Sequence, residues 1–184
     1  MSTDLILDIF KYYAKFVPKG VLEKIFVQPA ASRFAGYGQI RAEVLALPDT
    51  DVLPGLDAFI VSVNENFVSE RMKNASNHIL FVEYGTVTVD HTVPEGIQEH
   101  LAVSVVHKFS DSNSDSINEL IRMNQCFVLL DKILQTMAID QSMLDFCDGA
   151  LVTAPVKVEP VDPSLFYGCG GWVAQFKKVN TIII

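Results

Sequence analysis

Hydrophobic and polar positions alternate over two long stretches near the middle of the chain. The first is HILFVEYGTVTVD, residues 78–90, and the second is EHLAVSVVHKF, residues 99–109. Alternation with a period of two, in segments rich in β-branched and aromatic residues, predicts β-strands. Because turn-forming residues fill the HTVPEGIQ segment between them, the two strands are predicted to form a long hairpin.

A helical period replaces this alternation after the hairpin. The polar loop SDSNSDS, residues 110–116, leads into INELIRMNQCFVLLDKIL, and Ser116 and Glu119 have the spacing of a capping box. We predict a helix that runs to about Met137. Its apolar stripe comprises Leu120, Met123, Phe127, Leu130, Leu134 and Met137, and it is widened by Ile117, Ile121, Val128 and Ile133. A stripe this wide is typical of a helix that is covered on more than one side.

Shorter elements are predicted on the N-terminal side of the hairpin. A first helix should begin at Ser2 or Thr3, and a short second helix should follow the interruption at Pro18. QIRAEVLAL, residues 39–47, alternates as a strand does. AFIVSV, residues 58–63, is typical of a buried strand.

The remaining segments complete the order of elements. Residues 64–76 fit a helix or a surface arm, residues 150–161 alternate again, and GWVAQFKKVNTIII predicts a last strand with an apolar tail. The order is therefore helix, strand region, hairpin, long helix, hairpin. Since hairpins pair antiparallel strands and helices cover sheets, we predict an α+β fold. In it, a mostly antiparallel sheet packs against a long amphipathic helix and an N-terminal helix.

One domain is expected, because 184 residues are enough to bury a substantial core. It should consist of an N-terminal helical segment at 1–27, a variable region or insertion at 28–76, and a hairpin–helix–hairpin core at 77–184. Hydrophobic residues make up 49% of the chain and charged residues 20%. This apolar surplus indicates that some hydrophobic side chains face a partner rather than the core.

Charge and hydropathy argue against two classes of partner. The chain has 14 basic and 22 acidic residues, a net charge of −8, and its densest basic run is the pair Lys177–Lys178. Nucleic-acid binding needs clustered basic residues, so sequence-specific recognition of nucleic acid is not expected. No apolar run reaches the roughly 20 residues that cross a bilayer. The N-terminal MSTDLILDIFKYY lacks the basic start of a secretory signal, so we expect a cytoplasmic protein with no membrane partner.

The segment FYGCGGWVAQF, residues 166–176, looks most like an active site, because Gly168, Gly170 and Gly171 surround Cys169. A phosphate-binding loop needs a helix directly after its glycines, whereas WVAQFKKV alternates as a strand does. We therefore predict that the three glycines form a structural corner, at a hairpin or bulge. A nucleophilic cysteine needs a neighbouring base, and no histidine has a sequence context that marks it as one.

Histidines and cysteines give weaker signals. His107 alternates with apolar neighbours, which predicts a core histidine bonded to a loop group rather than a metal ligand. His91 and His100 can face each other across the hairpin, but two imidazoles without a third ligand make a poor zinc site. The chain has three cysteines and no CxxC spacing, so buried, reduced thiols are expected.

Carboxylates gather around the first hairpin, where they fit a solvated sheet edge better than a hydrolase pair. They are Glu83, Asp90, Glu95 and Glu99. Asp111 and Asp115 stand in the polar loop, but the glycine and closing glutamate of a calcium loop are missing. We therefore predict no catalytic residue, no cofactor-binding residue and no metal ligand.

The order of elements from HILFVEYGTVTVD, through EHLAVSVVHKF, INELIRMNQCFVLLDKIL and LVTAPVKVEPV, to YGCGGWVAQFKKV resembles that of the tail-terminator (tail-completion) proteins of long-tailed bacteriophages. The resemblance covers roughly residues 79–179 and the N-terminal helix. It lies in the order and length of the elements, not in a motif, and residues 28–76 are longer than the pattern needs.

This resemblance implies a structural subunit of a phage or prophage tail. Such a protein forms a homo-oligomeric ring, typically hexameric, that caps the tail tube and joins it to the head, without catalytic residues or a cofactor. The implied partners are further copies of the chain and the tail-tube and head-completion proteins. The implied location is the cytoplasm of the bacterial host and then the virion tail.

Subunit contacts are expected on the first hairpin and on the C-terminal strand. The candidate interface residues are Glu83, Tyr84, Val87, Val89, Val105, Phe109, Ile182 and Ile183. An alternative function is a small-molecule or peptide-binding module, with a pocket between Trp172, Tyr167 and the long helix. A third class, a hydrolase that uses the hairpin carboxylates or Cys169, stays open.

Overall fold

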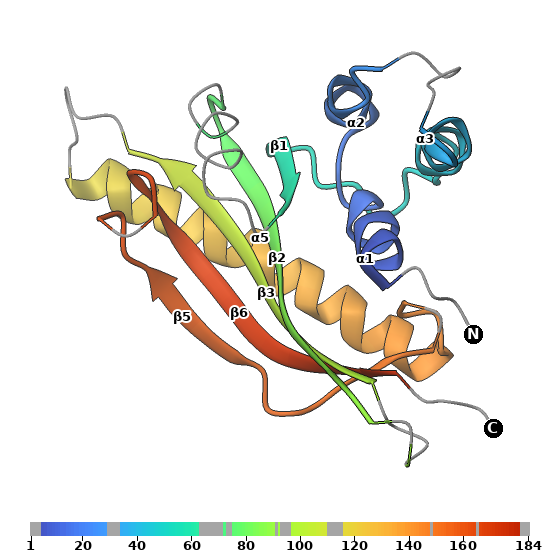
Figure 1. Ribbon diagram of the computed structural model, residues 1–184. Helices are drawn as coiled ribbons and strands as arrows, with labels where there is room; N and C mark the ends of the chain where they lie inside the picture. Colours follow the sequence, from blue (N-terminus) through green and yellow to red (C-terminus); the bar gives the residue numbers. More distant parts are fainter. Residues whose placement is uncertain are drawn as a thin grey trace.

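A mixed β-sheet forms the centre of the protein (Figure 1). The computed structural model describes residues 5–28, 34–62, 72, 75–90, 92, 97–109, 116–147, 149–164 and 166–180. Within them, six strands form one sheet in the order β1-β2-β3-β6-β4, and β5 also pairs with β6. The strands are β1 (Leu56–Val61), β2 (His78–Val89), β3 (Ile97–Lys108), β4 (Leu151–Val152), β5 (Lys157–Val161) and β6 (Cys169–Asn180).

The pairing of these strands is mostly antiparallel. β2 and β3 form the predicted long hairpin, β6 lies antiparallel to β3, and β4 and β5 both lie antiparallel to β6. Only β1, among the described strands, pairs in parallel, with β2. Together with the helices on the sheet, this pairing confirms the predicted α+β class.

Two helices cover one face of the sheet. They are α1 (Leu5–Ala14) and the long α5 (Ser116–Met143), while α2 (Lys19–Ile25) and α3 (Tyr37–Leu45) follow α1 at one end of the sheet (Figure 1). α1 contacts the last turns of α5: the Tyr13 hydroxyl donates to Met137 Sδ over 3.5 Å, and the Tyr12 hydroxyl donates to Asp140 Oδ2 over 2.5 Å. These contacts fix α1 at the C-terminal end of α5.

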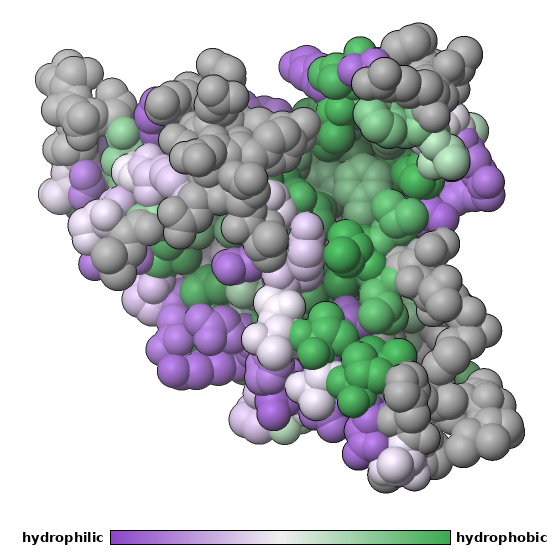
Figure 2. All heavy atoms as spheres, in the orientation of Figure 1, coloured by the Kyte–Doolittle hydropathy of each residue, from purple (hydrophilic) through white to green (hydrophobic). Residues whose placement is uncertain are grey.

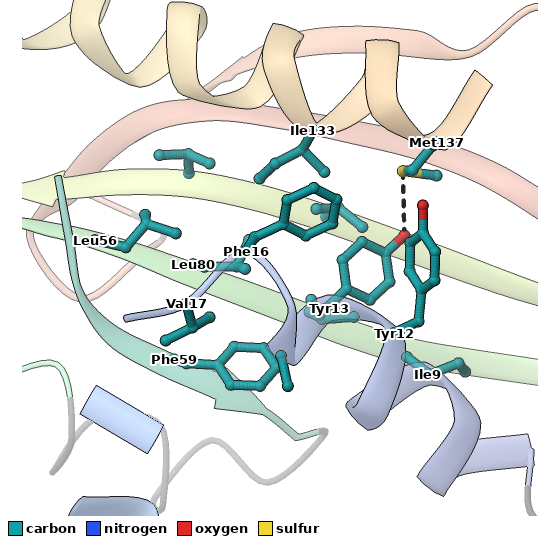
Figure 3. Packing of buried hydrophobic residues seen from close by; sticks show 14 of the residues in the cluster. Ile9, Tyr12, Tyr13, Phe16, Val17, Leu56, Phe59, Leu80, Ile133 and Met137 are labelled. Atoms are coloured by element: carbon teal, nitrogen blue, oxygen red, sulfur yellow. Dashed lines mark hydrogen bonds between the residues drawn. The ribbon is translucent and has the colours of Figure 1, made fainter. Parts of the chain in front are cut away.

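The main core lies between these helices and the sheet (Figure 3). Tyr13 and Phe16 point from the α1 region toward Ile133 and Met137 of α5, above Leu80 of β2. Alternate residues of β2, such as Ile79 and Phe81, belong to a smaller cluster on the opposite face, which also contains Ile60, Met72, Val106 and Cys169. The sheet therefore buries apolar residues on both faces near β1.

Residues 39–47 do not form the predicted strand. Most of them belong to α3, which begins after Gly36 in the left-handed conformation at φ 78°. The alternation in QIRAEVLAL is misleading, because Ile40 and Val44 stand four residues apart and therefore also share one face of a helix. Gln, Arg, Ala, Glu and Leu are good helix formers, and only Val44 of this helix is buried. Helix propensity thus prevails over the period-two pattern.

Residues 150–161 form two strands instead of one. β4 ends at Val152, and β5 begins at Lys157. Pro155 stands between them and has no N–H to donate to a ladder, so the pairing with β6 is interrupted there. The apolar alternation in this segment therefore reflects two short strands beside β6 and not one continuous strand.

α5 is longer than predicted. It begins at Ser116 and ends at Met143, six residues beyond Met137. Ser116 is already helical, so the cap position falls on residue 115, which lies outside the described residues. Most of residues 64–76 and most of the SDSNSDS loop also lie outside them. Within 64–76, Met72 is described and is buried.

The three glycines of the predicted corner have two different roles. Gly168 lies in the turn before β6 with φ 73°, a conformation that glycine adopts without a steric penalty. Gly170 and Gly171 lie in β6 itself, where there is no room for a side chain. A Cβ on Gly170 would come within 2.1 Å of the Phe109 ring, and one on Gly171 within 2.2 Å of the Val105 carbonyl oxygen.

Candidate functional site

The outer edge of β2 lacks a described partner strand over its second half. The parallel pairing with β1 ends at Val61 and Val82, with a last hydrogen bond from Ser62 N to the Val82 oxygen of 3.2 Å. From Glu83 to Val89 the strand is largely exposed, and the exposed fractions of Val87 and Val89 are 43% and 51%. Sheet edges of this kind are templates for association, so the hairpin offers an open flank.

An apolar groove lies beside this flank, between the start of α1 and the hairpin. Its volume is about 340 Å³, and we call it the hairpin groove. It is lined by Leu5, Ile6, Leu7 and Ile9 of α1 and by Tyr84, Gly85, Val87 and Glu99 of the hairpin. Figure 2 shows hydrophobic surface that runs from α1 down to the lower part of the hairpin. Of the α1 residues in this lining, Ile6 is 48% exposed, so apolar surface is accessible to solvent at the groove.

A buried ion pair lies behind the groove. Lys178 Nζ of β6 is 3.0 Å from Glu99 Oε1 of β3, and the two side chains are only 1% and 3% exposed. The two residues are direct partners across the β3–β6 ladder. The prediction that Glu99 belongs to a solvated carboxylate face is therefore wrong, because a basic partner 79 residues away in the chain allows its burial. Of the other predicted carboxylates, Glu83 and Asp90 are exposed, and Glu95 lies outside the described residues.

A second apolar surface lies on the first three turns of α5. We call it the α5 stripe, and it consists of Ile117, Leu120, Ile121, Phe127 and Val128, which are 42–65% exposed. The other exposed positions between residues 116 and 128 are occupied by serine, asparagine and glutamine, and the two charged residues there, Glu119 and Arg122, are half-buried. An apolar face of this size is typical of an interaction surface.

The α5 stripe corrects the predicted buried face of the helix. The buried residues of α5 are Cys126, Leu130, Ile133 and Met137, whereas Leu120 and Phe127, which we predicted in the main stripe, face solvent. Apolar residues stand on several sides of the first half of the helix, so the periodicity alone leaves open which side meets the sheet. The prediction that this helix has more apolar surface than one sheet can cover agrees with the exposed α5 stripe.

The remaining predicted interface residues have different surroundings. Val105 is fully buried in the main core, so it is not available to a second subunit, and that prediction is wrong. Phe109 is half-buried, and its ring packs over Gly170. Ile182 and Ile183 lie outside the described residues. The exposed members of the predicted set are Glu83, Val87 and Val89, while Tyr84 lines the hairpin groove.

The predicted aromatic pocket is filled by its own side chains. Trp172 Nε1 donates to the Met123 carbonyl oxygen over 3.0 Å, and its ring contacts Phe127 edge-on at 5.2 Å. Tyr167 instead contacts Phe166, which packs on Phe81 at the opposite face of the sheet. Trp172 and Tyr167 therefore do not line one cavity.

A polar cluster that the sequence did not reveal lies at the other end of the hairpin. His78 and His107 are direct partners across β2 and β3, and their ring centroids are 5.4 Å apart. Arg122 of α5 donates through Nη1 to His107 Nε2, and His78 Nδ1 is 3.4 Å from the Gly55 oxygen. The prediction of a core histidine is correct for His107, but its partner comes from α5 and not from a loop.

The electrostatics of this cluster favour neutral imidazoles. Burial, the Arg122 guanidinium and the neighbouring His78 lower the pKa of His107 from 6.5 to about 4, and burial lowers the pKa of His78. Three buried atoms have no hydrogen-bond partner among the described residues: Asp57 Oδ1, His78 Nε2 and His107 Nδ1. Arg122 disfavours a cation beside them, and in the described part of the chain no three His, Cys, Asp or Glu side chains are arranged to hold a metal.

The three cysteines are free and buried. Burial raises the pKa of the Cys126 and Cys147 thiols to about 12 and also raises that of Cys169. The thiolate is the nucleophilic form, so these thiols are held in the unreactive state. Cys169 packs with Val106 on the face of the sheet opposite to α5, whereas His107 faces Arg122 of α5. The strand alternation therefore separates the cysteine from the imidazole.

Comparison with known proteins gives no assignment: no family model, no curated protein and no solved structure matches this chain. Among the described helices, none combines the length and the apolar composition needed to cross a bilayer. The surfaces that invite a functional interpretation are thus the hairpin groove with its open strand edge and the α5 stripe.

Proposed function

We propose that the chain is a structural subunit of the tail-terminator or head–tail joining type, from a phage or prophage, and that it acts by assembling into a homo-oligomeric ring. The observation that carries the proposal is that two apolar surfaces, the hairpin groove and the α5 stripe, are exposed on one chain. The order of elements, with a long hairpin, a long helix and the closing strands β4, β5 and β6, gives the proposal its family.

Ring assembly needs two different surfaces on each subunit. One surface of each copy then meets a different surface of the next copy, and the same contact repeats from copy to copy. The series of copies closes into a ring if a whole number of the rotations between neighbouring copies makes a full turn. The strand edge at Glu83–Val89, which has no described partner strand, adds backbone N–H and C=O groups to the hairpin side of such a contact. The function would then be geometric, and it would need no reactive group.

The charge of the chain is compatible with this role. With a net charge of −8, the lumen of a ring would repel the DNA phosphates that pass through it. The same charge gives the subunits long-range repulsion, so the contact between them has to rest on short-range apolar burial.

The oligomeric state tests the proposal. Light scattering coupled to size-exclusion chromatography, at about 1–100 µM protein, should show a closed oligomer of one defined size, and negative-stain electron microscopy should show rings. A monomer at every concentration would refute ring assembly. Co-purification with a tail-tube protein from the same genome would test the position in the tail, independently of the ring itself.

A second candidate function is the binding of a small apolar ligand in the hairpin groove. Its volume of about 340 Å³ is within the range of small-molecule sites, and its lining is mostly apolar. This differs from the predicted pocket at Trp172. A thermal-shift series with fatty acids of increasing length tests it: stabilisation that disappears in Val87→Glu would favour a ligand site, and a flat series would exclude these ligands.

A further inference from the structure

We propose that the α5 stripe of one copy docks into the hairpin groove of the next copy. This inference rests on the proposed ring function and assigns the two halves of the subunit contact. The stripe is a ridge of apolar side chains on a helix, with anchors at residues 117, 120, 121, 127 and 128. These anchors lie at i, i+3, i+4, i+10 and i+11, with Asn124 at i+7, so they share one face, as do the anchors of a helix that lies in an apolar groove.

The two surfaces lie at different ends of the molecule. Tyr12 and Tyr13 hold α1 against Asp140 and Met137 near the end of α5, so the groove beside α1 is near that end. The α5 stripe runs from Ile117 to Val128, which are twenty and nine residues before Met137, or about 30 and about 14 Å along a helix at 1.5 Å per residue. Because α5 packs in the core through other, buried residues, one copy cannot place its own stripe in its own groove, and the contact must join two copies.

Charge favours a second copy of this chain as the occupant. Two copies with a net charge of −8 repel each other, so the contact between them is most favourable where neither copy places acidic groups against the other. None of the five α5 stripe residues is charged, and the charged residue that lines the groove, Glu99, is paired with Lys178 behind it. A cationic partner would be favoured by exposed acidic residues, which neither the α5 stripe nor the groove lining supplies; the exposed Glu83 lies at the start of the strand edge beside the groove.

The α5 stripe provides an apolar area close to that of one side of a stable contact. At roughly 30 Å² per apolar carbon, the exposed parts of the five stripe side chains amount to roughly 330 Å². A standard interface buries about 800 Å² on each partner, of which about 57%, or about 450 Å², is apolar. The stripe alone supplies most of this area, and the open strand edge beside the groove can supply polar contacts.

Complementing variants test the assignment. Leu120→Glu disables the stripe and leaves the groove intact, whereas Val87→Glu, with Ile6→Glu as a second version, disables the groove and leaves the stripe intact. Each variant alone should be monomeric, with the dissociation constant of self-association raised on the order of 100-fold by burial of an unpaired charge. Gln135→Glu, on an exposed part of α5 outside the stripe, is the matched control and should assemble normally.

A mixture of the two variants gives the decisive result. The intact groove of Leu120→Glu can accept the intact stripe of Val87→Glu, but neither chain can extend further, so sedimentation velocity should show a one-to-one dimer and nothing larger. If the stripe paired with another stripe, Val87→Glu alone would still associate and the mixture would form no new species, which would overturn the inference.

Failure of the inference can be separated from failure of the proposed function. A monomeric wild type refutes the ring itself. A wild type that assembles while both variants also assemble refutes only this contact. A chain that ends at Asn180 should still assemble; if it does not, the apolar segment 181–184 and not the α5 stripe occupies the groove. Circular dichroism of each variant verifies that the fold is retained.

Discussion

Glu99 and Lys178 are a buried ion pair, and such pairs respond to single and double substitutions in different ways. Both side chains are almost completely removed from water, 3.0 Å apart. Lys178→Met should lower the free energy of unfolding by about 3–5 kcal/mol, because the Glu99 carboxylate would be buried without its cation. Urea denaturation followed by circular dichroism measures this loss.

The double variant Glu99→Leu/Lys178→Met provides the control. It removes both charges together and should recover most of the stability, since replacing a buried pair by apolar residues is often neutral or stabilising. If Lys178→Met alone costs less than about 1 kcal/mol, the pair is hydrated and the groove behind α1 is wetter than its lining indicates.

His107 makes the stability depend on pH. Its folded pKa of about 4 lies below the ordinary 6.5, so between these values the unfolded chain binds a proton that the folded chain does not. Stability contributed by the neutral imidazole is therefore complete above pH 6.5 and is lost as the pH falls toward 4. The loss should be about 1–3 kcal/mol, and His78, whose pKa is lowered too, adds in the same direction.

The measurement compares urea midpoints at pH 7 and pH 5 for the wild type and for His107→Gln. The variant should show a flatter dependence, since Gln does not titrate and can still accept a hydrogen bond from Arg122. An unchanged slope in the variant would assign the pH dependence to other groups.

At the scale of whole elements, the contact between α1 and α5 depends on a small polar network around Asp140. This carboxylate accepts from the Tyr12 hydroxyl and forms an ion pair with Lys15, and all three groups are largely buried. Asp140→Asn should destabilise the fold by about 1–3 kcal/mol, because hydrogen bonds to charged groups are the stronger ones. This loss of stability should be larger than that caused by most surface substitutions, and differential scanning fluorimetry of the variants can compare the two.

Asp131→Asn is the matched control on the same helix. Asp131 is exposed and accepts a hydrogen bond from Gln135 one turn later, so the loss of stability should stay within about 0.5 kcal/mol. Equal effects of the two substitutions would show that the α1–α5 contact does not depend on Asp140.

The elements with strong local signals could be predicted from the sequence, and those decided by tertiary contacts could not. β2, β3 and α5 carry long, regular patterns, and the structure confirms them. The sequence predicts a strand where α3 forms, because Ile40, Ala42 and Val44 fit a period of two. Ile40 and Val44 also fit a helical period, so these positions do not distinguish a strand from a helix. The break at Pro155 falls at a sheet edge, where alternation continues although pairing does not.

The candidate surfaces could be predicted only in part. Subunit contacts on the hairpin stay a prediction: Val87 and Val89 are exposed there, but Val105 was wrongly included, because both faces of the strand are apolar near its end. Leu120 and Phe127 were predicted in one stripe with the buried Leu130 and Met137, since a helix that is apolar on several sides does not reveal which side meets the sheet. The burial of Glu99 and the contacts of His107 with His78 and Arg122 were missed for one reason: the partner residues come from other elements of the chain.

At the scale of the whole molecule, a net charge of −8 and two neutral apolar surfaces act in opposite directions. The charge keeps copies apart at long range, and its effect falls off over the Debye length, about 10 Å at 0.1 M salt. The apolar surfaces act only on contact. The strength of assembly through the α5 stripe and the hairpin groove therefore depends on the balance between charge repulsion and apolar burial, and the ionic strength changes this balance.

Raising NaCl from 50 to 500 mM should tighten self-association several-fold, because salt screens the repulsion between acidic copies and leaves apolar burial intact or strengthened. Sedimentation velocity over a concentration series at each salt gives the dissociation constant, with circular dichroism to confirm an unchanged fold. An interface built on ion pairs would respond in the opposite sense, since screening weakens exposed charge pairs. Association that weakens with salt would therefore contradict the apolar contact and indicate that oppositely charged groups hold the copies together.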